Sequence, residues 1–257
     1  MLAALKYEFN MMIKTIKGFL KRQLLARGYH VVWANPTRRV TGISLELDLQ
    51  GAVQESSPVC FDIGANIGQT IRMLQHVFKV PRIYAFEPSS ACFTQLENEN
   101  FGMNTLLHNL ALGEVMCERQ FNHYATSTLD SFHQLSASEE NPFREWGIET
   151  QSTVSIITFD DFVQQHNVSR IDLLKTDTQG FDLQVLRGAS GSFQSGIVQN
   201  VLVELNFLEL YQDQDSAAEI LTFLKTHGFG LVDMYEKVYC GRVMGWCTAL
   251  FSRIADD

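Results

Sequence analysis

A glycine-containing turn follows the first apolar run in the main part of the sequence. The run 59–63 includes Asp62 and leads into Gly64 and Gly68, after which the apolar residues take helical spacing. Glycines at these two positions let the backbone turn sharply and approach a ligand closely. The expected helix directs its N-terminus at the same place, so the sequence predicts a small-molecule site directly after this strand.

An acid stands at the end of the next expected strand, 19 residues beyond Gly68. From that position, Glu87 can accept hydrogen bonds from both ribose hydroxyls of a nucleoside. We therefore expect a nucleoside-containing cofactor. The alternative is that the glycines serve only a tight turn between strand and helix.

The residue types in the turn distinguish between cofactors. The dinucleotide-binding fingerprint has a glycine where this sequence has Asn66. The carboxylate of Asp62 would repel a pyrophosphate group, whereas it suits an ammonium or a sulfonium group. S-adenosylmethionine carries both of these cations, and we predict it as the cofactor.

Apolar runs and helical patterns alternate along residues 59–254. Strands that alternate with helices imply crossover connections, and hence an α/β fold with a mostly parallel sheet. Residues 113–150 are predicted to hold a strand pair and a mobile connection. The expected strands are 59–63, 82–86, 105–110, 154–158, 171–176 and 198–205, followed by an antiparallel pair at 229–235 and 248–254; the expected helices are 68–78, one that starts after 89–90, 159–165, 183–187 and 216–226.

Positive charge is concentrated near the N-terminus. Residues 1–39 carry a net charge of +7, and the remainder carries −16. Apolar residues at steps of three and four predict an amphipathic helix over residues 3–27, closed by Gly28. Such a helix can lie on an anionic membrane surface, pack on the main domain, or join two copies in a homodimer.

Two further segments connect this helix to the main domain. Apolar and polar residues alternate over 43–49, which predicts a short strand. Residues 50–58 are small and polar, as is typical of a linker. We therefore expect an N-terminal extension at 1–50 and a main domain at 51–257.

The composition is typical of a soluble globular protein. Of the 257 residues, 46% are hydrophobic and 19% are charged, and the net charge of −9 argues against general nucleic-acid binding. The five cysteines are scattered and form no C-x-x-C pair, so neither a zinc cluster nor a disulfide framework is expected. Without a long apolar run or a recognisable signal peptide, we expect a cytoplasmic protein, with peripheral contact at the inner membrane surface if the basic helix binds lipid.

Several motifs occur in one order along residues 58–236. They are FDIGANIG at 61–68, AFEP at 85–88, NLALG at 109–113, STL at 127–129, TFDD at 158–161 and IDLLKTDTQGFDLQVLRGA at 171–189. In these motifs the sequence resembles the FkbM family of S-adenosylmethionine-dependent methyltransferases. The last block is the most specific part of the resemblance, and it departs from the usual family pattern in having Gln179 where an acid is common.

The resemblance implies an activity, a fold and a set of cofactor contacts. The activity is methyl transfer to an oxygen, most often a hydroxyl of a sugar or another natural product. The fold is a Rossmann-like sheet of seven strands, mostly parallel, with helices on both faces and an antiparallel last pair. The implied cofactor-binding residues are Asp62, Gly64, Ala65, Asn66 and Gly68 at the methionine part, Glu87 and Pro88 at the ribose, Asn109 near the adenine or ribose, and Asp177. For Asn109, the alternative is a turn residue without contact to a ligand.

Methyl transfer to an alcohol also requires a group that takes the hydroxyl proton. Asp177 follows the central strand and is the first candidate for a catalytic base; its alternative role is to cap the next helix. Glu204 lies inside an apolar strand, where an acid is costly unless paired, so its alternative is a structural ion pair. His123 is the third candidate, and its alternative is a surface histidine. The aspartates form no compact ligand loop, so we expect no metal.

Two other functions fit part of the same pattern. An NAD-dependent oxidoreductase uses the same strand, glycine turn and acid, although Asn66 argues against it. A non-catalytic binding module can keep the same fold, although the acids at Asp62, Glu87 and Asp177 argue against that. The expected partner is a small-molecule or glycan acceptor and not a nucleic acid. Its identity cannot be read from the sequence.

Overall fold

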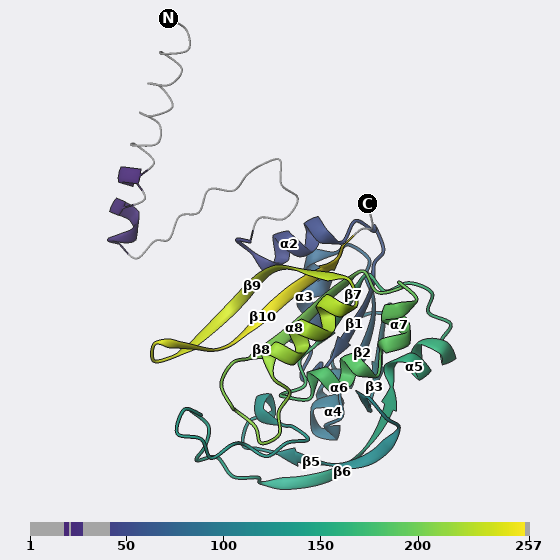
Figure 1. Cartoon of the computed structure of the whole chain (residues 1–257). Helices are drawn as coiled ribbons and strands as arrows, with labels where there is room; N and C mark the ends of the chain where they lie inside the picture. The colour runs from purple at the N-terminus through teal and green to yellow at the C-terminus, as the bar shows by residue number, and fades with distance from the viewer. Residues whose placement is uncertain (1–17, 21, 28–41, 255–257) are drawn as a thin grey trace, which may run out of the picture.

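A seven-stranded sheet forms the centre of the protein (Figure 1). The computed structural model describes residues 18–20, 22–27 and 42–254. The strand order is β3-β2-β1-β7-β8-β10-β9, with parallel pairing from β3 to β8 and antiparallel pairing of β10 with both neighbours. The predicted α/β fold and its antiparallel last pair are confirmed. The strands are β1 Val59–Ile63, β2 Arg82–Phe86, β3 Thr105–His108, β7 Leu173–Thr176, β8 Asn200–Asn206, β9 Phe229–Cys240 and β10 Val243–Arg253.

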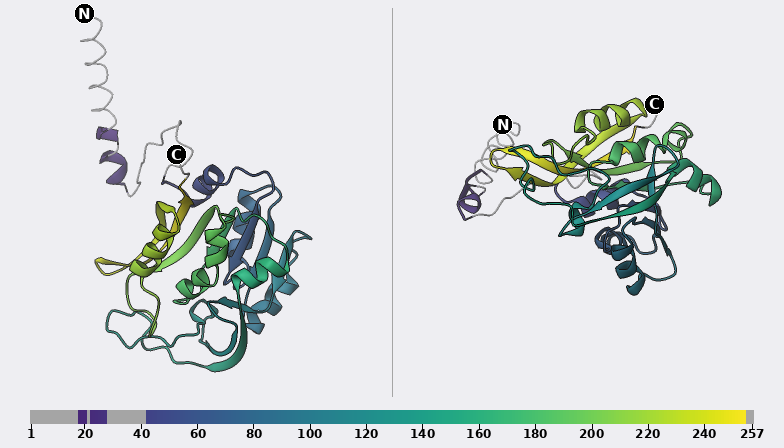
Figure 2. Two further views of the ribbon diagram at one scale, coloured as in Figure 1. Left: turned by 45° about the vertical axis from the view of Figure 1, so that its right-hand side comes forward. Right: turned by 90° about the horizontal axis from the view of Figure 1, so that it is seen from below.

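Helices cover both faces of the sheet, as the view from below in Figure 2 shows. One face carries α2, α3 and α4, whose apolar side chains share one buried cluster. The other face carries α5, α6, α7 and α8, which share a larger cluster. The helices are α2 Leu45–Ala52, α3 Gln69–Val77, α4 Ser90–Asn98, α5 Phe159–Gln165, α6 Asp182–Arg187, α7 Ser190–Gln194 and α8 Ala217–Thr226.

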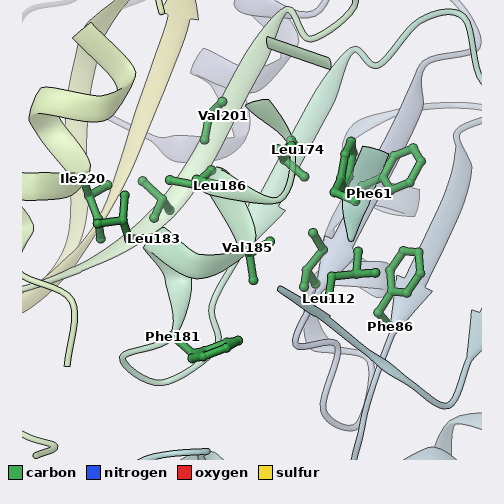
Figure 3. Close-up of a cluster of buried hydrophobic side chains, with 14 of the residues drawn as sticks. Phe61, Phe86, Leu112, Leu174, Phe181, Leu183, Val185, Leu186, Val201 and Ile220 are labelled. Carbon is green, nitrogen blue, oxygen red and sulfur yellow. The ribbon is translucent and has the colours of Figure 1, made fainter. Parts of the chain in front are cut away.

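The sequence of strand β1 is almost continuously apolar because the strand is buried on both sides. Neighbouring side chains of a strand point to opposite faces, and here both faces are covered by helices. Phe61 belongs to the cluster with α5 to α8, whereas Cys60 belongs to the cluster with α2 to α4. The Phe61 ring stacks on Tyr84 of β2, with their centroids 4.8 Å apart. Figure 3 shows Phe61 among buried side chains of β2, β7, β8 and α6.

A separate three-stranded sheet accounts for much of residues 111–158. Its strands are β4 Ala111–Gly113, β5 Cys117–His123 and β6 Thr150–Thr158, with β5 and β6 antiparallel. Of the strand pair predicted within 113–150, only β5 is found, because its partner β6 begins at Thr150 and is the strand expected over 154–158, extended at its start. The strand expected over 105–110 ends at His108, and the chain then turns into β4. Phe132, from the β5–β6 connection, packs on Phe181 at the start of α6, which joins the small sheet to the main one.

The strand expected over residues 43–49 is wrong, because this segment belongs to helix α2. Leu45 and Leu49 are four residues apart and pack toward the core, while Leu47 between them is 57% exposed. Within the alternating pattern, Leu45 and Leu49 thus form one face of a helix, and Leu47 lies on the other side. Asp48 is buried and accepts a hydrogen bond from the hydroxyl of Tyr235 at 2.7 Å. Since α2 extends to Ala52 and packs in the core, it crosses the domain boundary expected at residue 50.

Most of the amphipathic helix expected over 3–27 lies outside the described residues. The described pieces 18–20 and 22–25 are helical, and Phe19 and Leu20 are exposed. No helix among the described residues is long and apolar enough to cross a membrane.

A buried acid anchors the turn between β7 and α6. The carboxylate of Asp182 accepts hydrogen bonds from the Thr176 hydroxyl at 2.7 Å and from the Thr178 backbone N–H at 3.1 Å. Burial, together with the nearby charge of Asp177, raises the pKa of Asp182 to about 7. In the unfolded chain the pKa returns to its ordinary value of about 4. The protonated acid therefore favours the folded state.

We predict that Asp182→Asn flattens the dependence of stability on pH. A raised pKa contributes stability that is fully present below about pH 4 and is lost as the pH rises through about 7. For the wild type, this loss amounts to roughly 2–4 kcal/mol of unfolding free energy. An asparagine stays neutral and can still accept from Thr176, so the variant should lose less between pH 5 and 8 in urea unfolding. If the unfolding free energies of the two proteins changed equally with pH, this role of Asp182 would be contradicted.

Candidate active site

A cavity of about 830 Å³ lies where the ends of β1, β2, β7 and β8 meet. The strand order reverses between β1 and β7, and α/β sheets bind ligands at such a reversal. The first residues of α2 and residues 234–237 of β9 close the opposite wall. The cavity is therefore at the position predicted from the sequence, with a further wall that the sequence did not indicate.

The turn after β1 brings its backbone to the cavity, as expected. Gly64 has φ +79°, and a Cβ there would clash with the backbone oxygen of Asp177. Only glycine therefore allows β1 and β7 to approach so closely at this point. Gly64, Ala65 and Asn66 all line the cavity. Gly68 does not; it starts α3 with φ +87° and faces the ring of Phe101, so its role is in packing.

Glu87 lies at the cavity, at the end of β2, with its carboxylate oriented by two backbone groups. One carboxylate oxygen accepts from the N–H of Asn66 and the other from that of Ser89, each at 2.7 Å. Each oxygen keeps a free lone pair that can accept from a ribose hydroxyl. Burial raises the pKa of Glu87 to about 7 against the opposing effect of these hydrogen bonds. Pro88 lines the cavity beside it.

Asp62 is fully buried and forms an ion pair with Lys175 of β7, at 2.9 Å between Oδ1 and Nζ. Asp62 does not line the cavity, whereas Lys175 does. The same ammonium donates to the backbone oxygen of Gly64 at 2.9 Å. Burial alone would lower the pKa of Lys175, but the carboxylates of Asp62 and Asp177 outweigh it and raise that pKa. Asp62 therefore lies behind Lys175 rather than on the cavity surface, where it holds Lys175 and, through it, the glycine turn.

Two carboxylates meet in the cavity beyond β7 and β8. Asp177 follows β7, and Glu204 projects from β8. The side-chain amide of Gln179 donates to Asp177 at 2.8 Å and reaches Glu204 at 3.4 Å. Burial raises the pKa of Glu204 well above its ordinary value, and the charge of Asp177 raises it further. The helix-capping alternative for Asp177 is not observed, because α6 begins after Phe181.

His123 and Asn109 lie outside the residues that line the cavity. The ring of His123 is bonded on both sides, to Asp130 at 2.9 Å and to Ser152 at 2.8 Å. Asp130 lines the cavity but His123 does not, so the structure does not bring His123 together with the other candidate bases. Asn109 donates to the backbone oxygens of Glu87 and Pro88, at 2.8 and 3.2 Å. It thereby supports the turn that holds Glu87, in line with its alternative role as a turn residue.

Three residues of the site were not identified from the sequence as functional. Lys175 could have been recognised, because a lysine inside the apolar run Leu173–Thr176 must be paired. Gln179 was noted only as a departure from a family pattern. Tyr211 is fully buried, and its hydroxyl donates to the side-chain oxygen of Gln179 at 2.8 Å. No local pattern indicated Tyr211, because it approaches from a connection after β8.

The charges around the cavity favour a cationic ligand. Six carboxylates and two ammonium groups line it, namely Glu46, Glu87, Asp130, Asp177, Glu204 and Glu236 against Lys175 and Lys237. Since Lys175 is already paired with Asp62, little positive charge remains to bind a pyrophosphate. A nucleoside with a sulfonium and an ammonium group fits this arrangement. Its ribose would meet Glu87, its methionine part would meet the backbone of Gly64–Asn66, and its ammonium would meet Asp177.

Comparison with known proteins agrees with this chemistry. A family model described as the methyltransferase FkbM domain matches residues 62–231. The chain is 28% identical over 188 residues to methyltransferase 1 of Beauveria bassiana, covering 66% of this chain and 71% of that protein. It is 24% identical over 210 residues to 31-O-demethyl-FK506 methyltransferase FkbM of Streptomyces tacrolimicus, covering 71% and 76%. It is 26% identical over 196 residues to the hexuronic acid methyltransferase AglP of Haloferax volcanii, covering 76% and 74%.

The fold and the cavity define a Rossmann-like protein that binds a nucleoside cofactor at the carboxyl edge of its sheet. The chain belongs to the FkbM methyltransferase family. The predicted family is thus confirmed, its cofactor is S-adenosylmethionine, and the NAD-dependent alternative is set aside.

We predict that Glu87→Ala weakens binding of S-adenosylhomocysteine about ten- to hundredfold, because charge-assisted hydrogen bonds to the ribose are lost. Wild-type affinity should also rise as the pH increases through about 7, since the carboxylate is the better acceptor. Glu87→Gln should lose this pH dependence. Calorimetric titration at pH 6 and pH 8 measures both effects, with circular dichroism as the control for folding. Unchanged affinity in Glu87→Ala would place the ribose elsewhere.

Proposed function

We propose that the protein is an S-adenosylmethionine-dependent O-methyltransferase whose acceptor is a hydroxyl group of a saccharide or a similar natural product. The observation that carries this proposal is the carboxylate pair Asp177 and Glu204 in the cavity. An alcohol is a weak nucleophile until its proton is taken, and a carboxylate within hydrogen-bond reach can take it.

The chain's part in this reaction is to position the acceptor and to receive a proton. When bound, S-adenosylmethionine supplies an activated methyl group on its sulfonium. The acceptor oxygen forms a bond to the methyl carbon as the carbon–sulfur bond breaks, and the hydroxyl proton passes to one carboxylate of the pair. Holding the reacting atoms in line supplies much of the rate. The electrons of the broken bond remain on sulfur, which leaves as S-adenosylhomocysteine.

The wall opposite the strand ends supports a polar, hydroxylated acceptor. It contains Glu46 at the start of α2 together with Glu236 and Lys237 of β9. The Thr248 hydroxyl donates to Glu236 at 3.0 Å, and all of these groups can exchange hydrogen bonds with hydroxyls. Two similar proteins have names that state a hexuronic acid and a demethylated natural product as substrates, which agrees with this acceptor class.

A small-molecule or glycan acceptor also fits the charge of the cavity better than a nucleic acid does. The phosphates of a nucleic acid bind through lysine and arginine. Lys175 and Lys237 are the two basic residues among those that line the cavity, and Lys175 is committed to Asp62. We infer that the acceptor carries hydroxyl groups rather than a phosphate backbone.

The assay for this proposal uses purified protein and methyl-labelled S-adenosylmethionine. We expect label in one or more components of glycan, glycolipid and polyketide extracts, and a methyl ether in the isolated product by NMR. Transfer of the label to nitrogen or carbon, with none to oxygen, would contradict O-methylation. Protein without an added extract controls for cofactor hydrolysis.

We predict that Asp177→Asn leaves a folded enzyme with turnover reduced about 10²- to 10⁴-fold. The amide keeps the shape of the side chain, but it carries no charge and accepts no proton. Initial rates at saturating S-adenosylmethionine measure this effect, and thermal melting reports on folding. Near-normal turnover with a lower melting temperature would show instead that Asp177 only stabilises the turn.

A further inference from the structure

Gln179 lies between the two carboxylates of the site and contacts both of them. Its Nε2 donates to Asp177 Oδ1 at 2.8 Å and reaches Glu204 Oε2 at 3.4 Å. The residue has φ +54°, and its backbone oxygen accepts from the hydroxyl of Ser131 at 2.7 Å. The main chain and the side chain are therefore both held in place.

Tyr211 determines which end of the Gln179 amide faces the acids. Its hydroxyl donates to the amide oxygen of Gln179 at 2.8 Å. Burial, reinforced by the charge of Glu204, raises the pKa of Tyr211 well above its ordinary value. The hydroxyl thus stays protonated and remains a donor. The hydroxyl also lies 3.2 Å from the backbone oxygen of Leu129, but its shorter bond is to Gln179, whose amide nitrogen points to Asp177 and Glu204.

The two acids receive unequal support from this amide. A bond of 2.8 Å to Asp177 is well within the normal range for N–H···O, whereas 3.4 Å to Glu204 is at its weak end. The only other hydrogen bond found for the Glu204 carboxylate among the described residues comes from Asn206, also at 3.4 Å. A hydrogen bond to the charged form of an acid favours that form. The two acids therefore differ in their hydrogen bonding, and Glu204 is the one with weak partners.

We propose that Gln179 is a positioning residue: its amide holds Asp177 as the fixed negative charge of the site and leaves Glu204 to take the proton from the acceptor hydroxyl. This assignment rests on the proposed O-methyl transfer. It adds an identity for the base, and it makes the glutamine that replaces an acid a functional part of the site.

Several other groups act on this pair and must be considered in any pH dependence. Burial and two neighbouring acids raise the pKa of Glu204, and Lys175 opposes them in part. The titratable groups that act on the pair are Lys175 on β7, Asp62 on β1, Asp182 on α6, Cys247 on β10 and Tyr211, and Tyr124 and Asp130 act in turn on Tyr211. None of these changes in the variants below, except that one variant removes the Tyr211 hydroxyl.

The first test is the dependence of kcat/KM on pH, which reports on the free enzyme. For the wild type, kcat/KM should rise with pH, and the midpoint of this rise should lie above the pKa of an ordinary carboxyl group. Gln179→Glu adds a negative charge beside both acids. The midpoint of the rise should therefore move to higher pH by about one unit, and kcat/KM at pH values below the midpoint should fall roughly tenfold. Tyr211→Phe keeps the ring but releases the amide, and a smaller shift in the same direction is expected. Gln184→Glu is the matched control.

Gln184 is suitable because its side-chain amide also donates to a carboxylate, Asp215, at 3.3 Å, but outside the residues that line the cavity. Gln184→Glu adds the same charge on nearby α6 and should leave the pH profile in place. If Gln179→Glu and Gln184→Glu both keep the wild-type profile and differ from it only in melting temperature, Gln179 has a structural role and the proposal fails.

The second test needs no acceptor and no turnover. The carboxyl carbons of glutamate are labelled with ¹³C, and the NMR signal of Glu204 is assigned by its loss in Glu204→Gln. Its titration should move to higher pH in Gln179→Glu relative to the wild type, by about one unit. An unmoved titration would overturn the proposal even if the enzyme methylates hydroxyls. A moved titration supports the coupling of Gln179 to Glu204, whereas an acceptor without a hydroxyl group would overturn only the assignment of Glu204 as the base, so the two failures are distinguishable.

Discussion

The buried ion pair between Asp62 and Lys175 is the interaction on which the candidate site depends. The two residues lie opposite each other on β1 and β7, where the strand order reverses. Burying two charges costs desolvation energy, which is repaid only by close geometry and further hydrogen bonds. The ammonium meets this condition through Asp62 at 2.9 Å and the backbone oxygen of Gly64 at 2.9 Å. Loss of either partner would leave an uncompensated charge beneath the glycine turn and displace the backbone that meets the cofactor.

Local patterns were sufficient to predict most of the sheet and the place of Glu87 and the glycine turn at the cavity. Glu87 could be found because its strand, its turn and its backbone partners lie close together in the sequence. The role of Asp62 could not, because Lys175 is on a strand formed much later in the chain. The segment 43–49 was mistaken for a strand for the same reason: the contact that settles its helical form joins Asp48 to Tyr235 at the far end of the domain. Alternation of apolar residues does not contain that information.

The cavity combines a backbone turn and a fixed carboxylate with a pair of carboxylates linked by one side chain. The backbone of Gly64–Asn66 and the carboxylate of Glu87 offer fixed hydrogen-bond partners and need not change during a reaction. Asp177 and Glu204 lie in the same cavity. The group that links them is the neutral side-chain amide of Gln179, not the cationic side chain of a lysine, arginine or histidine. An acid in place of that amide would put three carboxylates together, and mutual repulsion would favour protonation of at least one. The neutral glutamine avoids this third charge and donates a hydrogen bond instead.

The outer wall of the cavity differs from the strand ends in how far its residues are buried. Glu46, Glu236 and Lys237 are exposed, and they come from α2 and from the antiparallel edge of the sheet. Substitutions at such positions usually change stability by less than about 0.5 kcal/mol, whereas changes at the buried strand ends cost far more. This wall can consequently diverge between descendants of one ancestor while the cofactor half stays constant. The architecture thus places the positions that tolerate change and those that do not on different walls of one cavity.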